Sequence, residues 1–372
     1  MSPSTAAMSA LSLLRSRLSA NLDQLSPELA EKYGPFCDMT SNPAVLAALI
    51  ASDTHIEDVR RAVARARTEA EGDMDETIEL AIDMLVVTIS KLTLDHLTGR
   101  VHAQVSPRHA LSVESTILHA HRLIRLFAWD GISPGRICLQ IPATGAGMVA
   151  AAQLEKSGIR TCATTVFSLP QALAAEQAGC LYVAPYFNDM AVLFQPGTWR
   201  AYNDPGMEHP MSGVIRDIVD AYEGMVQKAG KGIKGHRPEV MVMNLVTPGE
   251  ALAVSTLGVD HISLSGKVME ELAGGKNEAT FMPEVLDEHE AILQPMELDD
   301  EMGSKKAKGK GKEKVPVATI PDTDWLADDG AALDEAIRSD EEVSRKLEYA
   351  VKAFEECEAR IAIVIRQMLL AS

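Results

Sequence analysis

The stretch RICLQIPATGAGMVAAAQLEKSGIRTCATTVF, residues 136–167, contains two short apolar runs separated by one amphipathic segment. Apolar runs of this length without polar alternation are typical of strands that are buried on both faces. The segment between them, Gly145–Lys156, has helical period and is long enough to connect two parallel strands. The stretch therefore predicts a strand–helix–strand unit with parallel strands.

The same unit recurs on both sides of this stretch. Buried strands are indicated near residues 18–23, 35–40, 101–105, 136–141, 161–167, 180–184, 240–245 and 261–264. Eight strands with helical crossovers favour an α/β fold of the (β/α)8 TIM-barrel type over a doubly wound sheet. The active site of such a barrel lies at the carboxyl ends of its strands, so polar residues there are the candidates for function.

Beyond residue 272 the pattern changes. Lys305–Lys314 is a Lys/Gly run close to the acidic segment Glu297–Glu301, and such a segment buries too little apolar surface to be ordered. A solvated linker is favoured over a nuclear-localisation or nucleic-acid role, because the acidic segment offsets the basic charge.

After this linker, apolar residues recur at three- and four-residue spacing, which predicts one long helix across the barrel, with a partner-binding helix as the alternative. These residues are Val343, Leu347, Val351, Phe354, Cys357, Ile361, Val364 and Met368. We expect a barrel over 1–295, a disordered linker insertion over 296–316 and C-terminal helices packed on the barrel over 317–372.

Charge and composition exclude several classes of protein. The 372 residues include 35 Lys+Arg and 53 Asp+Glu, which gives a net charge of −18. An acidic surface repels phosphate backbones and anionic lipids, so we expect neither a nucleic-acid nor a membrane partner. No apolar run approaches the ~20 residues that span a bilayer, and the N-terminus lacks the pattern of a secretory signal. A cytoplasmic location is therefore expected.

The cysteines and histidines indicate no metal or cofactor site. Five cysteines are scattered without a CxxC pair, which is typical of reduced thiols and unlike a disulfide framework or a thiolate zinc site. His119 and His121 are two residues apart, so a helix would direct them to different faces. The segment GAGMVA at 145–150 fits a loose dinucleotide fingerprint, but small residues at a helix start are the favoured interpretation. We expect a cofactor-independent protein without a metal.

Three stretches point to a family: GPFCDMTSNP at 34–43, QIPAT at 140–144 and VFSLPQA at 166–172. With LEKSGI at 154–159 and the pair AGC and APY within 178–186, they make the chain resemble the transaldolase family of class I aldolases. The resemblance runs from about residue 23 to 365, with the Lys/Gly run as an insertion. It implies a TIM barrel, in agreement with the strand count. It also implies a lysine on the fourth strand that forms an imine with a ketose, and carboxylates on the first and third strands that transfer protons.

The residues at the family's catalytic positions differ from the usual ones. Gln140 stands where the resemblance puts the imine-forming lysine, and an amide nitrogen cannot form an imine because its lone pair is delocalised. Asp23 matches the first-strand aspartate, and Gln104 replaces the third-strand glutamate. Tyr186 resembles the fructose-6-phosphate aldolase branch, in which a tyrosine helps to position the catalytic water. These four residues are the predicted catalytic set.

The predicted substrate-binding set indicates a substrate without phosphate. Thr40, Asn42 and Thr164 match positions that the family retains, and Lys267 follows the eighth predicted strand at the mouth of the barrel. The family's phosphate-binding arginines fall at Asp189 and at Val246, and its fifth-strand asparagine falls at Cys162. A carboxylate in place of an arginine repels a sugar phosphate by roughly 1–4 kcal/mol at close range.

The sequence therefore predicts a diverged transaldolase-like enzyme. It would make or break a carbon–carbon bond of a small non-phosphorylated carbonyl compound, by an aldol-type reaction or a cyclisation, within specialised biosynthesis. The alternatives are an orthodox transaldolase of the pentose phosphate pathway and a non-catalytic binding or regulatory protein. Each candidate also has a structural interpretation: Asp23 as a helix cap, the two glutamines as buried hydrogen-bonding groups, Tyr186 as a packed aromatic and Lys267 as a solvated lysine. A homodimer is left open.

Overall fold

Seven parallel strands form one curled sheet in the computed structural model, which describes residues 9–229, 237–274 and 323–371. The order of the strands is β1-β7-β6-β5-β4-β3-β2. The strands are β1 (Ser19–Leu22), β2 (Val101–Gln104), β3 (Ile137–Pro142), β4 (Thr161–Val166), β5 (Tyr182–Pro185), β6 (Glu239–Leu245) and β7 (His261–Leu264). The predicted linker, 296–316, lies outside the described residues, as do the predicted boundaries beside it.

Met39 connects the two edge strands and closes the sheet. It forms parallel bridges with Leu22 of β1 and with Val101 of β2. Its N–H donates to the carbonyl of Arg100 at 3.0 Å, and its own carbonyl accepts the N–H of His102 at 2.7 Å. The second predicted strand is therefore reduced to a segment of isolated bridges that alternates between its two neighbours. With this segment the parallel sheet forms a (β/α)8 barrel, and the predicted fold class is confirmed.

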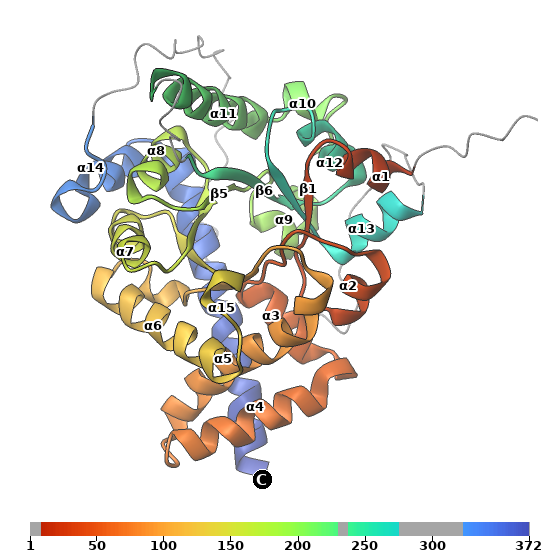
Figure 1. The fold of residues 1–372 in the computed structure, drawn as a ribbon, viewed down its shortest axis with the longest axis vertical. Helices are drawn as coiled ribbons and strands as arrows, with labels where there is room; N and C mark the ends of the chain where they lie inside the picture. Colours follow the sequence, from red (N-terminus) through yellow and green to blue (C-terminus); the bar gives the residue numbers. More distant parts are fainter. Residues whose placement is uncertain (1–8, 230–236, 275–322, 372) are drawn as a thin grey trace, which may run out of the picture.

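Helices follow the strands and surround the barrel (Figure 1). Several begin at the carboxyl ends of strands with a side-chain cap. Asn42 Oδ1 accepts the N–H groups of Ala44 and Val45 at 3.0 Å each, and Thr144 Oγ1 accepts the N–H of Gly147 at 2.9 Å. The α-helices before the C-terminal pair are α1 (Ala10–Arg15), α2 (Pro27–Tyr33), α3 (Pro43–Ala51), α4 (Ile56–Glu69), α5 (Met74–Thr93), α6 (Val113–Trp129), α7 (Gly145–Lys156), α8 (Leu169–Ala178), α9 (Ala191–Phe194), α10 (Pro205–Glu208), α11 (Pro210–Ala229), α12 (Pro248–Val254) and α13 (Gly266–Ala273).

Two further helices, α14 (Ala327–Arg338) and α15 (Glu341–Ala371), pack on the barrel, and α15 crosses its mouth. Glu358 of α15 accepts from Ser106 Oγ at 2.7 Å and from Arg108 Nε at 3.1 Å, in the loop after β2. Arg345 donates to Asp189 at 2.7 Å, in the loop after β5. The helix therefore spans the loops of one half of the mouth. In Figure 1 it runs behind the strands and ends beyond α4.

The buried face of α15 differs in part from the predicted stripe. Val343, Leu347, Phe354, Cys357 and Ile361 are buried as predicted, whereas Val351 is half-buried. The last two turns bury Ile365 and Leu369 in place of Val364 and Met368, which are half-buried. Alternating spacings of three and four residues average 3.5 residues, whereas an α-helix has 3.6 residues per turn. Over the 31 residues of α15 the side chains that face the barrel therefore drift away from the predicted stripe.

Glycine at the start of α7 allows α14 to approach. The N–H of Gly145 donates to Asp334 Oδ1 of α14 at 2.8 Å. A Cβ atom on Gly145 would lie 2.6 Å from the carbonyl oxygen of Gly330 and 2.7 Å from Asp334 Oδ2. Because a carboxylate of the chain itself occupies this helix start, the GAGMVA segment has a packing role, as the favoured interpretation of the sequence holds.

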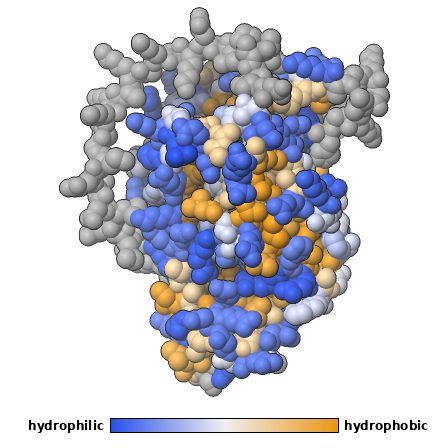
Figure 2. All heavy atoms as spheres, turned by 90° about the vertical axis from the view of Figure 1, so that its left-hand side faces the viewer, coloured by the Kyte–Doolittle hydropathy of each residue, from blue (hydrophilic) through white to orange (hydrophobic). Residues whose placement is uncertain are grey.

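The outer face over α7, α8 and α14 carries mostly hydrophilic side chains around an apolar area (Figure 2). Among the described residues, no helix combines the length and the apolar character that crossing a membrane requires.

Gly145→Ala tests the contact between α7 and α14. Because the added methyl meets backbone and carboxylate atoms at about 2.6–2.8 Å, we expect a loss of about 1–3 kcal/mol in unfolding free energy by denaturant titration. Gly213→Ala on α11 is the matched control, since a Cβ atom there meets nothing within 4 Å. It should be neutral or add up to about 1 kcal/mol. Equal effects of the two substitutions would contradict the assigned packing role.

Candidate active site

A pocket of about 490 Å³ opens at the carboxyl ends of β1, β6 and β7. Its wall combines apolar side chains of α3 and α9 with a few polar groups, a composition that suits small organic ligands. Of the predicted site residues, Asp23, Asn42 and Lys267 line this pocket. Of the remaining predicted residues, Gln104 is partly exposed and the others, Thr40, Gln140, Thr164 and Tyr186, are buried. The loops after β2 and β5 are in contact with α15.

Asp23 follows the end of β1, where its backbone N–H donates to the carbonyl of Leu264 at 2.8 Å. Thr40 Oγ1 donates to Asp23 Oδ1 at 2.7 Å and lies 2.6 Å from Ser263 Oγ. A hydroxyl has one proton, so Ser263 donates to Thr40 while Thr40 donates to Asp23. Desolvation raises the pKa of Asp23 to about 6, and the hydrogen bond from Thr40 offsets only part of this rise. Asp23 can therefore both accept and release a proton near neutral pH.

Gln104 and Gln140 lie opposite each other on the paired strands β2 and β3. Gln140 is completely buried. For both residues the amide nitrogen and oxygen are buried, and none of these four atoms has a hydrogen-bond partner among the described residues. A buried polar group without a partner costs about 1–3 kcal/mol. Among the described residues, these amides therefore make no hydrogen bond that would account for their burial.

Tyr186 and Thr164 form a second pair in the barrel. Thr164 Oγ1 donates to Tyr186 Oη at 3.3 Å, and the ring of Phe167 packs edge-on against Tyr186 with 5.9 Å between centroids. Burial raises the pKa of Tyr186 well above its ordinary value, and the nearby charge of Asp23 adds to the rise. The phenol therefore keeps its proton at neutral pH and can donate a hydrogen bond. Tyr186 is also a packed aromatic residue, so its two interpretations are compatible.

Two residues that the sequence did not single out belong to the same region. Ser263 on β7 extends the hydrogen-bond chain of Asp23, and Asn244 on β6 lines the pocket. Asn244 has φ of 57° and Thr165 at the end of β4 has φ of 55°, values that are unfavourable for a β-branched residue such as threonine. Strained residues at strand ends are frequent in functional sites. In the sequence, Ser263 is marked only by its place in the predicted strand near 261–264.

Asp189 and Val246, where the resemblance puts the family's phosphate-binding arginines, carry no positive charge. Asp189 Oδ1 accepts the N–H of Ala191 at 3.0 Å, and its other oxygen accepts from Arg345 of α15. Val246 lines the pocket. Asn42 has a structural role because its side-chain oxygen caps α3, although the residue also lines the pocket.

Asp23→Asn tests the desolvated carboxyl through the pH dependence of stability. Because the pKa of Asp23 is raised in the folded state, the ionised carboxyl destabilises the fold above about pH 6. This loss of stability disappears as the pH falls towards about 4, the pKa of an aspartate in the unfolded chain. We expect the variant to be more stable than the wild type by on the order of 2–3 kcal/mol at about pH 8. In paired urea titrations this difference should shrink towards about pH 4. A difference that is constant with pH would contradict the assignment.

Comparison with known proteins gives concordant findings. Residues 19–314 match the protein family described as Transaldolase/Fructose-6-phosphate aldolase. A transaldolase of Shewanella denitrificans is 29% identical over 266 residues, which cover 71% of this chain and 78% of that protein. A transaldolase of Fusarium oxysporum is 29% identical over 264 residues, covering 70% and 75%. A transaldolase of Acidobacterium capsulatum is 27% identical over 354 residues, covering 94% and 92%.

Proposed function

The chain belongs to the transaldolase/fructose-6-phosphate aldolase family, and on that premise we propose that it makes or breaks a carbon–carbon bond without an imine to lysine. The substrate is a small carbonyl compound without phosphate, and the reaction is an aldol-type addition, its reverse or a cyclisation. One observation carries the proposal. At the lysine position of the resemblance stands Gln140, a buried amide without a partner among the described residues.

An amide in this place can bind a carbonyl compound but cannot react with it. The Nε2–H groups of Gln140 and Gln104 can donate to a carbonyl or enolate oxygen, while the Oε1 atoms accept from substrate hydroxyls. Buried donors that already face the developing negative charge stabilise it more strongly than water does. The two neighbouring amides thus support polarisation of the carbonyl group as the substitute for imine formation.

Asp23 supports the proton transfers. It lines the pocket and also contacts Thr40 of the interior, so it stands between the open pocket and the buried layer. In the addition, the Asp23 carboxylate takes the proton α to the carbonyl group, and the electron pair of that C–H bond forms an enolate. The enolate carbon attacks a second carbonyl carbon, and the oxygen of that carbonyl group takes the proton back from Asp23, which restores the carboxylate. The protonated phenol of Tyr186 is a donor on the same side of the barrel.

The charges at the mouth support a substrate without phosphate. The carboxylate of Asp189 is paired with Arg345, and Arg345 is also bonded to Glu342 at 3.0 Å. Losing an arginine–phosphate contact removes about 1.5–3 kcal/mol of binding. Calorimetry with fructose 6-phosphate and sedoheptulose 7-phosphate should therefore show no binding tighter than about millimolar. Micromolar affinity for either sugar phosphate would favour an orthodox transaldolase.

Borohydride trapping tests the absence of the imine. With dihydroxyacetone, hydroxyacetone or fructose 6-phosphate, the wild-type protein should yield no reduced adduct, because Gln140 has no nucleophilic amine. Gln140→Lys should allow trapping, since burial lowers the pKa of a lysine and increases its neutral fraction.

The control for this experiment is Lys267→Met. Lys267 lines the pocket, so it is the amine from which relocated imine chemistry could start. Peptide mapping of the reduced wild-type protein distinguishes the two mechanisms: a mass increase on the Lys267 peptide, lost in Lys267→Met, would contradict the imine-free reaction.

A further inference from the structure

We propose that Cys37, Asp38 and His261 bind a divalent transition-metal ion of the zinc class at the amino ends of the strands. Cys37 and Asp38 belong to the segment that closes the barrel, and His261 is the first residue of β7. The site is thus separate from the pocket, which lies at the opposite ends of the strands. Its donors come from residues 37, 38 and 261, a separation that no sequence motif describes, and it revises the expectation that the chain has no metal.

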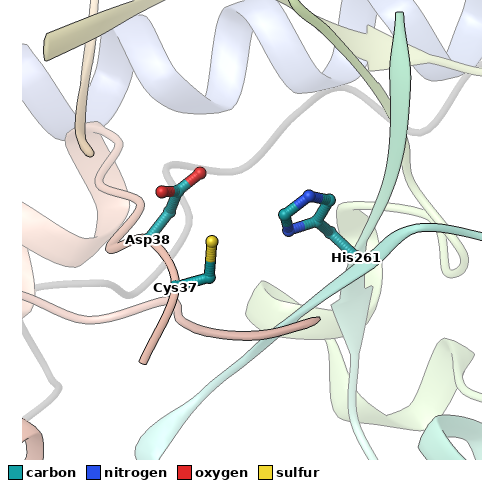
Figure 3. A group of neighbouring side chains, drawn as sticks. All are labelled: Cys37, Asp38 and His261. Atoms are coloured by element: carbon teal, nitrogen blue, oxygen red, sulfur yellow. The ribbon is translucent and has the colours of Figure 1, made fainter. Parts of the chain in front are cut away.

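The geometry of the three side chains suits such an ion. One potential ligand atom from each residue lies within 4.8 Å of the other two. In Figure 3, Cys37 and His261 face each other and the Asp38 carboxylate lies beside them. A thiolate, an imidazole nitrogen and a carboxylate oxygen are the three ligand types that Zn²⁺ takes in proteins. Three protein ligands leave the fourth tetrahedral position to water.

The two ring nitrogens of His261 have the surroundings that are typical of a metal-binding histidine. His261 is 4% exposed, and its Nδ1 is buried without a hydrogen-bond partner among the described residues. Its other ring nitrogen, Nε2, lies 2.5 Å from Glu239 Oε2. Histidines that bind metals generally donate their second ring N–H to a carboxylate, which orients the ring and directs the free lone pair at the metal. Here that arrangement leaves Nδ1 as the atom available to the ion.

The aspartate is held in a similar way. Asp38 is completely buried. The N–H of Arg100 donates to its Oδ1 at 2.6 Å, and His102 Nε2 lies 3.1 Å from its Oδ2. A Cβ atom on Gly99 would lie 2.1 Å from Asp38 Oδ1 and 3.2 Å from Cys37 Sγ. Glycine at this position therefore leaves the space that the two donor side chains occupy.

Of the three donor residues, Cys37 alone is partly exposed, whereas Asp38 and His261 are buried. Cys37 is partly exposed, whereas Cys138, Cys162, Cys180 and Cys357 are buried. When the ion binds, Cys37 and His261 release to solvent any proton held on Sγ and Nδ1, and each donates an electron pair to the metal. The bound ion would connect the closing segment, which is held by isolated bridges, to β7. Its expected effect is therefore stabilisation of the barrel.

The test uses the full-length protein after treatment with a chelator. Added Co²⁺ should bind at one site and give a thiolate-to-cobalt charge-transfer band, and Zn²⁺ should displace it and raise the melting temperature. Cys37→Ser and His261→Gln should lose the band. Glu239→Gln, which changes only the residue that orients the histidine, should weaken metal binding by about 10–100-fold. Cys357→Ala is the control and should keep the band and the affinity.

Alkylation of the wild-type protein gives a second measurement that needs no variant. Zn²⁺ should slow the reaction of Cys37 with iodoacetamide by about tenfold or more, as measured by mass spectrometry of the Cys37 peptide. A band that persists in Cys37→Ser, a wild-type protein without the band, or alkylation at the same rate with and without Zn²⁺ would each overturn the proposal.

Discussion

The pairing of Met39 with both β1 and β2 is the constraint on which the rest of the molecule depends. It converts an open seven-stranded sheet into a closed barrel with a very short segment. Because side chains alternate along a strand, burying Met39 on one side directs Asp38 and Thr40 to the other. Thr40 then meets Asp23 and Ser263 near the mouth, while Asp38 meets His102 and the backbone of Arg100 deeper in the barrel.

The barrel interior consequently has two polar layers with different chemistry. The upper layer combines a desolvated carboxyl, whose pKa is about 6 in Asp23, with two amides that lack partners among the described residues. Such a layer is suited to proton transfer and to binding an oxygen that gains negative charge. The lower layer contains Asp38, and Cys37 and His261 each bring a potential ligand atom within 4.8 Å of a carboxylate oxygen of Asp38. One closing segment contributes a residue to each layer, so the candidate active site and the proposed metal site share a structural origin.

Much of this fold could be predicted because its signals are local. Continuous apolar runs mark buried strands such as β3 and β4, and the helical period between them requires parallel crossovers. The apolar repeat likewise predicted the long C-terminal helix, but it did not predict the contacts that hold this helix across the mouth of the barrel. They join Arg345 to Asp189 and Glu358 to Ser106, pairs that are more than 150 residues apart in the chain.

Candidate positions for the site came from the resemblance to a family, as for Asp23, Gln140 and Thr40. Whether Gln140 is satisfied or without a partner depends on residues brought together from several strands, and the sequence alone left that open. The same limit applies to Ser263 and to the Cys37–His261 pair. Ser263 and His261 lie in a strand that was predicted correctly, whereas Cys37 lies in the segment that the structure reduces to isolated bridges. In each case the neighbour is distant in the chain, so local pattern contained no signal for the contact.

The central claim is that Asp23, and no lysine, moves the proton at the carbon next to the carbonyl group. Its most direct test is the exchange of the α-hydrogens of hydroxyacetone in D₂O, followed by NMR, for the wild type, Asp23→Asn and Lys267→Met. The account predicts exchange by the wild type and by Lys267→Met, and a decrease of about 10²–10⁴-fold in Asp23→Asn. Exchange that survives in Asp23→Asn but is lost in Lys267→Met, or no exchange by the wild type, would contradict it.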